Sequence, residues 1–193
     1  MLTYSIIRKL SAAAFVLCLP LAAADTYTID AVHSEVGFRI RHLVSKTPGR
    51  FTRFQGTIRV DEKQLSQSAV DVVIETASIN TDNEARDKHL RSPDFFDVEK
   101  FPAITFRSVA VKEVGKGRLQ VLGDLTMRGV SRRITIPVGI LGTMKGAQNE
   151  TRGGFEGAVT LNRNDFGITK FPGMLGDDVD ITLNIEAVKN EAK

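Results

Sequence analysis

The sequence predicts an all-β domain, an extended, closed, eight-stranded antiparallel β-barrel with a short helical insertion. Three observations lead to this expectation: apolar and polar residues alternate in eight segments, turn signals separate most of these segments, and one stretch follows a helical pattern. Alternation at every second position is typical of strands with one buried and one solvated face. Long strands of this kind favour closure, because a closed barrel has no exposed edge. A two-sheet sandwich is the main alternative.

The eight alternating segments follow one another along most of the chain. They cover residues 36–41, 54–61, 70–74, 104–108, 119–128, 133–140, 155–161 and 179–185, and a leader over Tyr27–Asp30 is expected to add an edge piece. The turn signals between them are rich in glycine. These signals are Pro48-Gly49, Gly115-Lys116-Gly117, Gly129-Val130-Ser131, Gly142 to Gly146 and Gly176-Asp177-Asp178. Short turns predict that consecutive strands are antiparallel neighbours.

One stretch breaks the alternation and predicts a helix. Thr81 is followed three residues later by Glu84, which is a capping-box signature, and residues 83–91 are mostly good helix formers. Ser92, followed by proline, is expected to begin a second short turn through Phe95 and Phe96. This long connection is predicted to cover one end or one side of the barrel.

The first residues resemble an export signal. Arg8 and Lys9 precede an apolar run over residues 10–21 that ends in three alanines. The run is too short for a membrane span, which needs about 20 residues. We expect residues 1–24 to be a cleaved signal peptide and residues 25–193 to be a single, soluble, periplasmic domain.

Composition limits the partners of the mature chain. The sequence contains one cysteine, Cys18, which lies in the predicted signal. The mature chain would therefore have no thiol that could form a disulfide or be oxidised in an oxidising compartment. Two of the 26 basic residues also leave with the signal, so 24 Lys and Arg face 23 Asp and Glu. A near-neutral balance with interspersed signs argues against a nucleic-acid surface.

Three glycines bear on whether the barrel is hollow. An eight-stranded barrel is either filled by its own side chains or wide enough for one elongated ligand. Gly56, Gly123 and Gly157 fall in phase with the apolar residues of their segments. They either mark bends and bulges needed for closure, or leave the interior partly empty for an apolar chain. The sequence leaves both readings open.

A series of short motifs resembles the YceI family over nearly the whole mature chain. In chain order the motifs are Tyr27-Thr28-Ile29-Asp30, His33-Ser34, Val36-Gly37-Phe38, His42, Gly49 with Phe51 and Gly56, Ile79-Asn80-Thr81, Arg86-Asp87-Lys88-His89-Leu90, Asp94-Phe95-Phe96-Asp97, Phe101-Pro102 with Ile104-Thr105-Phe106, Gly123-Asp124-Leu125-Thr126 with Gly129-Val130, and Arg163 through Gly167. Each motif alone is weak, but their shared order is specific.

The resemblance implies an extended lipocalin-like barrel that holds a polyisoprenoid, such as a polyprenyl phosphate or an isoprenoid quinone. It further implies a periplasmic carrier, storage or stress-related factor, with a membrane redox protein such as a cytochrome b as a second partner. A family ligand is an inference by analogy. No other cofactor is expected, and the sequence leaves a homodimer open.

Twelve residues are candidates for ligand contact. They are His33, Phe38, Ile40, His42, Phe54, Ile58, Arg86, His89, Phe95, Phe106, Leu125 and Phe166. The apolar members are ordinary core residues in a filled barrel and the ligand wall in a hollow one. The histidines and Arg86 are expected to supply polar contacts at one end, since a guanidinium suits a phosphate or quinone oxygen. Alternatively, Arg86 or Asp87 anchors the helix through a buried ion pair.

The sequence carries no recognisable catalytic motif. It has no Gly-x-Ser-x-Gly elbow, phosphate-cradling glycine loop or zincin motif, and its three histidines lack close metal-ligand spacing. We therefore predict no enzyme, no catalytic residue and no metal site. The alternatives are a small periplasmic hydrolase or isomerase that pairs His33 or His42 with Asp87, and an accessory protein to a membrane redox partner. A long apolar cavity favours the carrier, and a short polar cleft favours the enzyme.

Overall fold

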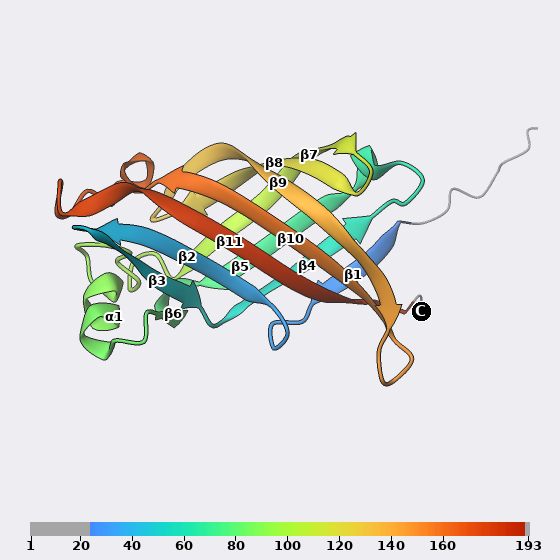
Figure 1. The fold of residues 1–193 in the computed structure, drawn as a ribbon, viewed down its shortest axis with the longest axis horizontal. Helices are drawn as coiled ribbons and strands as arrows, with labels where there is room; N and C mark the ends of the chain where they lie inside the picture. Colours follow the sequence, from blue (N-terminus) through green and yellow to red (C-terminus); the bar gives the residue numbers. More distant parts are fainter. Residues whose placement is uncertain (1–23, 192–193) are drawn as a thin grey trace, which may run out of the picture.

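Long antiparallel strands close into a barrel over residues 24–191, the part of the chain that the computed structural model describes (Figure 1). The strands are β1 (Asp25–Ile29), β2 (Glu35–His42), β3 (Ser45–Phe51), β4 (Phe54–Val60), β5 (Ala69–Glu75), β6 (Ile79–Asn80), β7 (Ala103–Gly115), β8 (Arg118–Met127), β9 (Val130–Lys145), β10 (Thr151–Asn162) and β11 (Leu175–Lys189). The one α-helix in this range is α1 (Glu84–Arg91), and three short 3-10 helices are η1 (Leu65–Gln67), η2 (Thr76–Ser78) and η3 (Arg163–Phe166).

Eight strands form the closed ring, which is the predicted number, but β1 takes the place in the ring that was expected for residues 36–41 of β2. The order is β1-β4-β5-β7-β8-β9-β10-β11, and β1 pairs with β11 to complete it. β2, β3 and β6 extend the ring at one end, because β2 pairs with the first part of β11 and β1 with its last residues. The leader over Tyr27–Asp30 is therefore not an edge piece, since β1 has a partner on each side.

Two strands were not predicted from the sequence, β3 and the two-residue β6. Pro48 and Gly49 were expected to form a turn, but they lie within β3 and pair with Arg39 and Phe38 of β2. The turn itself comes earlier, between β2 and β3. Proline is tolerated here because β3 has a neighbour on its other side only at its last two residues, and edge strands accept proline.

The other turn signals had mixed outcomes. The turns β7–β8 and β8–β9 lie where Gly115-Lys116-Gly117 and Gly129-Val130-Ser131 predicted them. The signal from Gly142 to Gly146 is right at its end, because Gly146 begins the β9–β10 turn and its N–H donates to the Glu150 carbonyl at 2.9 Å. Gly142, however, lies inside β9, beside a register shift with β10 at Gly154 and Phe155. Gly176-Asp177-Asp178 lies inside β11, where the register with β2 shifts between Leu175 and Val179. Glycine clusters therefore mark irregular pairing here, as β-bulges do.

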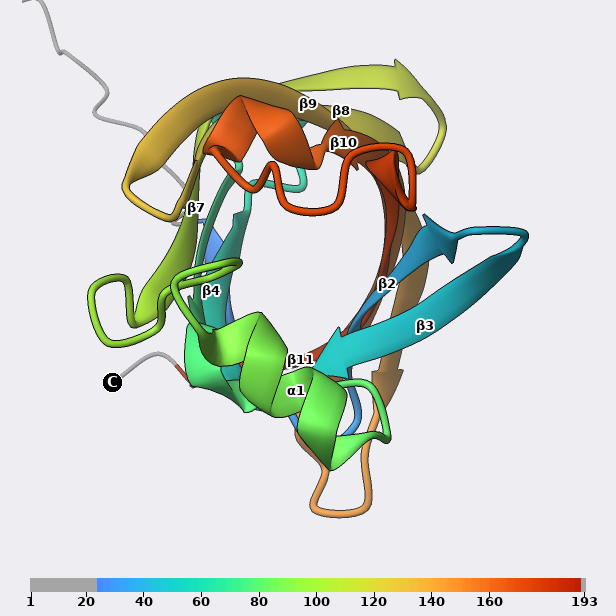
Figure 2. The same ribbon diagram turned by 90° about the vertical axis from the view of Figure 1, so that its left-hand side faces the viewer.

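The helical insertion forms as predicted, with a different N-cap. α1 begins after Asn83, whose side chain accepts a hydrogen bond from the backbone N–H of Arg86 at 2.9 Å. Thr81 does not cap the helix, because its hydroxyl is bonded to Asp87 instead. Figure 2 looks onto the barrel end that α1 borders, together with the β2–β3 hairpin and the segment leading into β11. We call this end the mouth.

Interior positions are apolar along the whole barrel. The main core holds residues such as Tyr27 and Phe155, whose rings meet edge to face at a centroid distance of 6.4 Å. A second small cluster of Val111, Leu119 and Val121 lies toward the end opposite the mouth. No helix within residues 24–191 is long and apolar enough to cross a membrane. The predicted signal peptide lies, apart from Ala24, outside the described residues.

Two of the three in-phase glycines are required for close packing. A Cβ on Gly56 would lie 2.6 Å from the carbonyl oxygen of Asp71, and one on Gly123 would lie 2.4 Å from the ring of Phe106. Aromatic rings that cover glycines on neighbouring strands are a known feature of coiled barrels. Gly157 lines the interior space. The structure thus favours the packing reading at Gly56 and Gly123.

Replacing Gly123 with alanine is expected to lower the free energy of unfolding by about 1–3 kcal/mol, the usual range for overpacking. The new methyl group would collide with the Phe106 ring and with the carbonyl oxygen of Arg107, 2.6 Å away. Urea unfolding measures the change. Gly115→Ala is the control, because its Cβ would have no heavy atom closer than 4.0 Å. Equal midpoints for both variants would contradict this account of Gly123.

Candidate functional site

A cavity of about 700 Å³ runs through the barrel. It reaches from His42 and Arg86 at the mouth to Leu65, Val111 and Leu119 near the opposite end. Its volume lies within the usual range for small-molecule sites, about 300–1,000 Å³. The barrel is therefore hollow, and its interior is long rather than cleft-shaped.

The cavity is apolar along its length and polar at the mouth. Forty of its 48 lining residues have no polar side-chain atom in an amide, hydroxyl or charged group. The eight exceptions are His42, Thr47, Ser68, Thr81, Arg86, His89, Glu156 and Arg163. Six of these eight belong to β2, β3, η3 or the β6–α1 region, all of which border the mouth. The lining therefore matches an amphipathic molecule with one polar end.

Ten of the twelve candidate residues line this cavity. They are Phe38, Ile40, His42, Phe54, Ile58, Arg86, His89, Phe95, Phe106 and Leu125. The other two candidates, His33 and Phe166, lie outside the cavity lining. His33 lies exposed in the turn between β1 and β2, where it binds Asp30 rather than the lumen. Phe166 is only 2% exposed and is absent from the lining, because the short helix η3 buries its ring in the main core.

Arg86 and Asp87 both anchor α1 through Thr81. The Arg86 guanidinium donates from Nε to Thr81 Oγ1 at 2.7 Å and from Nη2 to the Thr81 carbonyl at 2.8 Å. Buried Asp87 accepts from the Thr81 backbone N–H at 2.9 Å and from its hydroxyl at 2.5 Å. These are hydrogen bonds to a threonine instead of the predicted buried ion pair. Arg86 also lines the cavity, so one side chain both positions the helix and faces the mouth.

His89 joins α1 to the segment before β11. Its Nε2 lies 3.0 Å from Asp94 Oδ2, and its ring packs edge-on against Phe95 and Phe171 at centroid distances of 5.1 and 5.9 Å. Lys170 Nζ lies 3.2 Å from the other oxygen of Asp94. The hydrogen bond from His89, followed by that from Lys170, lowers the pKa of the Asp94 carboxyl. This group closes part of the mouth.

Arg163 holds the segment that runs from η3 into β11. Its buried guanidinium donates to the carbonyl oxygens of Gly176, Ile168 and Lys170 at 2.9, 2.7 and 2.8 Å. It also lies 3.1 Å from Asp177 Oδ1. The sequence placed Arg163 in a family motif but gave it no role, because three of its four partners are backbone carbonyls that no residue pattern reveals.

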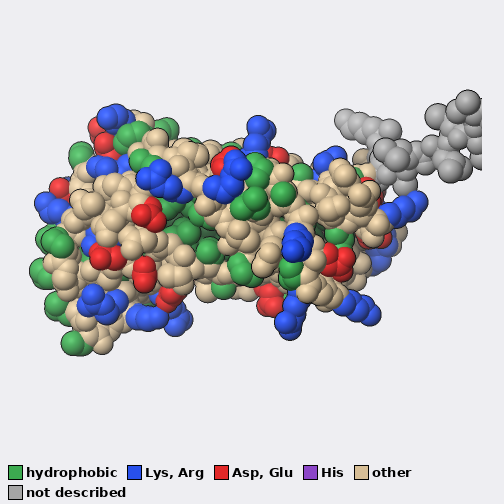
Figure 3. Space-filling model, turned by 90° about the horizontal axis from the view of Figure 1, so that it is seen from above, with side chains coloured by type: hydrophobic (Ala, Val, Ile, Leu, Met, Phe, Trp, Pro, Cys, Tyr) green, Lys and Arg blue, Asp and Glu red, His purple; other side chains and the backbone are tan. Residues whose placement is uncertain are grey.

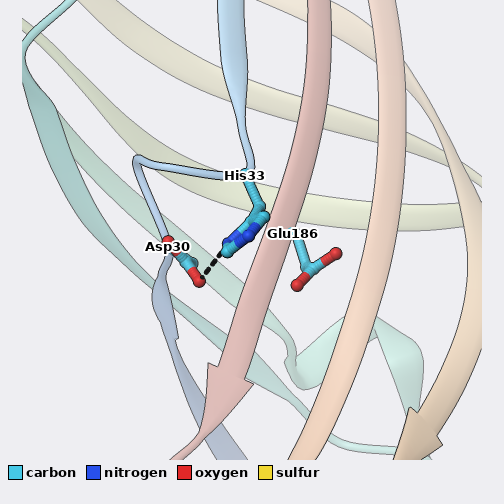
Figure 4. Close-up of side chains that lie close together, drawn as sticks. All are labelled: Asp30, His33 and Glu186. Atoms are coloured by element: carbon cyan, nitrogen blue, oxygen red, sulfur yellow. Dashed lines mark hydrogen bonds and ion pairs between the residues drawn. The ribbon is translucent and has the colours of Figure 1, made fainter. Parts of the chain in front are cut away.

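A polar cluster outside the barrel was not foreseen. Asp30, His33 and Glu186 lie so close that one ligand atom from each falls within 4.8 Å of the others (Figure 4). Arg152 enters the same cluster: its Nη1 donates to Asp30 Oδ2 at 2.8 Å and to Glu186 Oε1. The guanidinium thus occupies the position that a cation would take. Only Asp30 and His33 are near in sequence, so spacing could not reveal the cluster.

The cluster predicts a pH dependence of stability. Hydrogen bonds from His33 and then Arg152 hold the pKa of the Asp30 carboxyl well below its ordinary value of 3.8. Because the folded-state pKa is lower than the unfolded one, this stabilisation is complete above about pH 4 and is lost as the pH falls toward the depressed pKa. Asp30→Asn should therefore unfold at lower urea than the wild type at neutral pH, and the two midpoints should converge in acid. A difference between the two midpoints that stays constant with pH would contradict this account of Asp30.

Asp71→Asn is the control for the loss of one carboxylate, because it breaks an exposed ion pair with Arg107.

The histidine–carboxylate pairs expected for a hydrolase are not formed. His33 binds Asp30, His89 binds Asp94, and Asp87 is bonded to Thr81. His33 lies outside the barrel on the turn after β1, so it cannot meet Asp87 at the mouth. Of the two cavity types that separate carrier from enzyme, the structure has the long apolar one.

Comparison with known proteins identifies the family. The sequence matches the YceI-like domain over residues 27–187. The chain belongs to the YceI family. UPF0312 proteins of Vibrio parahaemolyticus and Pseudomonas paraeruginosa are each 40% identical to it, over 182 and 171 residues. These alignments cover 91% and 87% of this chain and 94% and 89% of the relatives.

Solved structures confirm the barrel of this YceI-family chain. The Campylobacter jejuni YceI protein is 30% identical, with a TM-score of 0.69 over 78% of this chain and 90% of that chain. BcnA of Burkholderia cenocepacia is 24% identical, with a TM-score of 0.75 over 82% and 98%. A polyisoprenoid binding domain from Saccharophagus degradans, implicated in plant cell wall breakdown, is 14% identical, with a TM-score of 0.65 over 85% and 98%. The last two show a shared fold alone.

Proposed function

We propose that this YceI-family protein binds one long isoprenoid lipid inside its barrel and acts as a carrier or store for it. One observation carries the proposal: the cavity is long and apolar, and six of its eight polar lining residues lie at the mouth. Burial of a hydrocarbon chain contributes roughly 25 cal/mol per Å² of apolar surface, so an apolar tunnel favours a long chain over a compact polar substrate.

The polar end of the lipid is proposed to lie at the mouth. His42, Arg86 and His89 line the cavity there, and Arg86 supplies a guanidinium, which pairs well with phosphate oxygens. The hydrocarbon then extends past Phe106 toward Leu119. This orientation keeps every charged group of the ligand close to solvent and avoids burying an unpaired charge.

Two observations support an isoprenoid as the ligand, the family of the chain and the cavity. The YceI family includes this chain, and a fold neighbour is a polyisoprenoid binding domain. The cavity adds a physical requirement, since its apolar lining matches a hydrocarbon chain. We further propose that the chain is exported to the periplasm, because residues 1–24 resemble a signal peptide. We also propose that it is a binding protein rather than an enzyme, which the long apolar cavity supports.

Binding of three lipids tests the proposal. The purified protein is titrated with a polyprenyl phosphate, an isoprenoid quinone and a straight-chain fatty acid, and the bound stoichiometry is measured by native mass spectrometry. One isoprenoid per chain, bound more tightly than the fatty acid, supports the proposal. Failure of both isoprenoids to bind would overturn it.

Arg86→Met is expected to weaken binding of the polyprenyl phosphate selectively, by about tenfold or more, because a hydrogen bond to a charged group contributes about 1.5–3 kcal/mol. The quinone, which carries no charge, should lose less. The ratio of the two dissociation constants is the readout, since a merely structural loss of the Thr81 contacts would weaken both lipids together. Arg107→Met removes an exposed cation on the outside of β7 and is the matched control.

A further inference from the structure

Four exposed apolar side chains lie together at the mouth. Leu43 and Val44 form the turn between β2 and β3, and Phe171 and Met174 lie in the loop before β11. The Leu43 N–H donates to the Met174 carbonyl at 2.9 Å, so the two loops meet in one surface, which we call the mouth patch. Val44 is fully exposed, Leu43 and Met174 are about half exposed, and Phe171 is 37% exposed. Soluble surfaces seldom cluster large apolar residues in this way.

The mouth patch is continuous with the cavity. Phe171 and Met174 line the cavity and are also exposed to solvent. An apolar chain that enters or leaves the barrel between these loops therefore passes from one apolar surface to another. The mouth patch would therefore contact the surroundings from which an apolar ligand enters the barrel.

Basic residues surround the mouth patch. The turn 41–46 contains Arg41 and Lys46, the loop 167–174 contains Lys170, and neither segment contains an acidic residue. Arg41 Nη1 donates to the Leu43 carbonyl at 3.0 Å. Lys46 and Lys170 are held beside the patch by Asp180 and Asp94, through ion pairs that remain exposed and are weak in water. Figure 3 shows hydrophobic side chains beside Lys and Arg at this end of the molecule, on the left.

Backbone conformation at the two loops supports a function for these side chains. Leu43 and Phe171 have φ angles of 52° and 55°, in the left-handed region that disfavours bulky residues. Asparagine or glycine would adopt this conformation at lower cost. Large apolar residues thus occupy strained positions where they are exposed, which is typical of functional sites.

We propose that the mouth patch docks on a lipid bilayer with anionic head groups. Leu43, Val44, Phe171 and Met174 would enter the boundary between head groups and acyl chains, and the three cations would contact lipid phosphates. Apolar side chains ringed by Lys and Arg have the composition of an interfacial membrane anchor. The proposal goes beyond lipid binding, because docking requires no isoprenoid. It would place the mouth against the phase in which isoprenoids dissolve.

Vesicle sedimentation tests the proposal. The chain is recovered after expression in a Gram-negative host and its N-terminus is determined, because an uncleaved apolar run over residues 10–21 would itself insert. Vesicles contain phosphatidylethanolamine with phosphatidylglycerol, or phosphatidylcholine alone, and no isoprenoid. The wild type is expected to sediment with the anionic vesicles and about tenfold less with the neutral ones at low salt.

Leu43→Asp/Val44→Asp should lower the anionic partition by about tenfold or more, because two side chains then enter with charge instead of apolar surface. Both sites are exposed and aspartate tolerates the left-handed region, so the fold should persist, which circular dichroism checks. Leu141→Asp/Met144→Asp is the matched control, since these exposed residues lie on β9 near its hairpin with β10, away from the mouth. The proposal is wrong if the wild type stays in solution, if both double variants partition alike, or if neutral vesicles bind equally well. Because the vesicles hold no isoprenoid, these outcomes are independent of the lipid-binding proposal.

Discussion

Replacing Phe106 with arginine is expected to empty the barrel of lipid. Phe106 lines the cavity near the start of β7, and its ring lies against Gly123 on the neighbouring strand. An arginine there brings a charge into an apolar lumen, at a cost of several kcal/mol unless the guanidinium reaches solvent. It also occupies the volume that a hydrocarbon chain would fill. We expect lipid retention to fall by at least about tenfold, which corresponds to about 1.4 kcal/mol.

The measurement is the amount of lipid extracted per mole of purified protein. Val109→Arg is the control, because Val109 lies on the same strand with its side chain half exposed. Thermal unfolding is followed for both variants, since a buried charge can also unfold a domain. A folded Phe106→Arg variant with wild-type lipid content would show that the ligand does not pass this point of the cavity.

Replacing Arg163 with methionine is expected to lower the free energy of unfolding by about 3 kcal/mol or more, because several buried carbonyl groups lose their donor at once. The Arg163 side chain is 4% exposed and bonds three carbonyl oxygens between Ile168 and Gly176, so these groups are shielded from solvent that could replace the guanidinium. The loss should also loosen the loop that carries Phe171 and Met174.

Urea unfolding gives the size of the Arg163 effect, and hydrogen exchange of residues 167–176 shows whether the loop opens. Arg107→Met removes an arginine from an exposed ion pair and should leave the unfolding midpoint close to that of the wild type. If Arg163→Met were as stable as Arg107→Met, the assignment of Arg163 as the anchor of the mouth loop would be contradicted.

Alternation was sufficient to predict the barrel because burial of one strand face is a local property. Phe38 and Ile40, or Phe54 and Ile58, point inward from single strands, and the cavity lining confirms them. The capping signal near Thr81 predicted the helix correctly but named the wrong capping residue. Asn83 caps the helix, and the Thr81 hydroxyl donates a hydrogen bond to Asp87. The local sequence pattern therefore located the helix but not the hydrogen bonds that hold it.

What the sequence could not predict depends on contacts between distant residues. Pro48-Gly49 is a turn signal by its residue types, but these residues lie in a strand because β3 pairs with β2. His33 was placed at the ligand because it shares motifs with His42, yet Asp30 and the approach of Arg152 from β10 hold the β1–β2 turn outside the barrel. The sequence also could not show whether the barrel is hollow. The space beside Gly123 is filled by the ring of Phe106 from the neighbouring strand, and the alternating pattern does not reveal this contact.

The most direct test of the central claim is native mass spectrometry of the protein purified from a bacterial host without added lipid, followed by organic extraction and identification of the released molecule. The proposed function predicts one isoprenoid chain per protein molecule, released only when the barrel is disrupted. A mass equal to that of the polypeptide alone, unchanged after incubation with a polyprenyl phosphate and with an isoprenoid quinone, would contradict it.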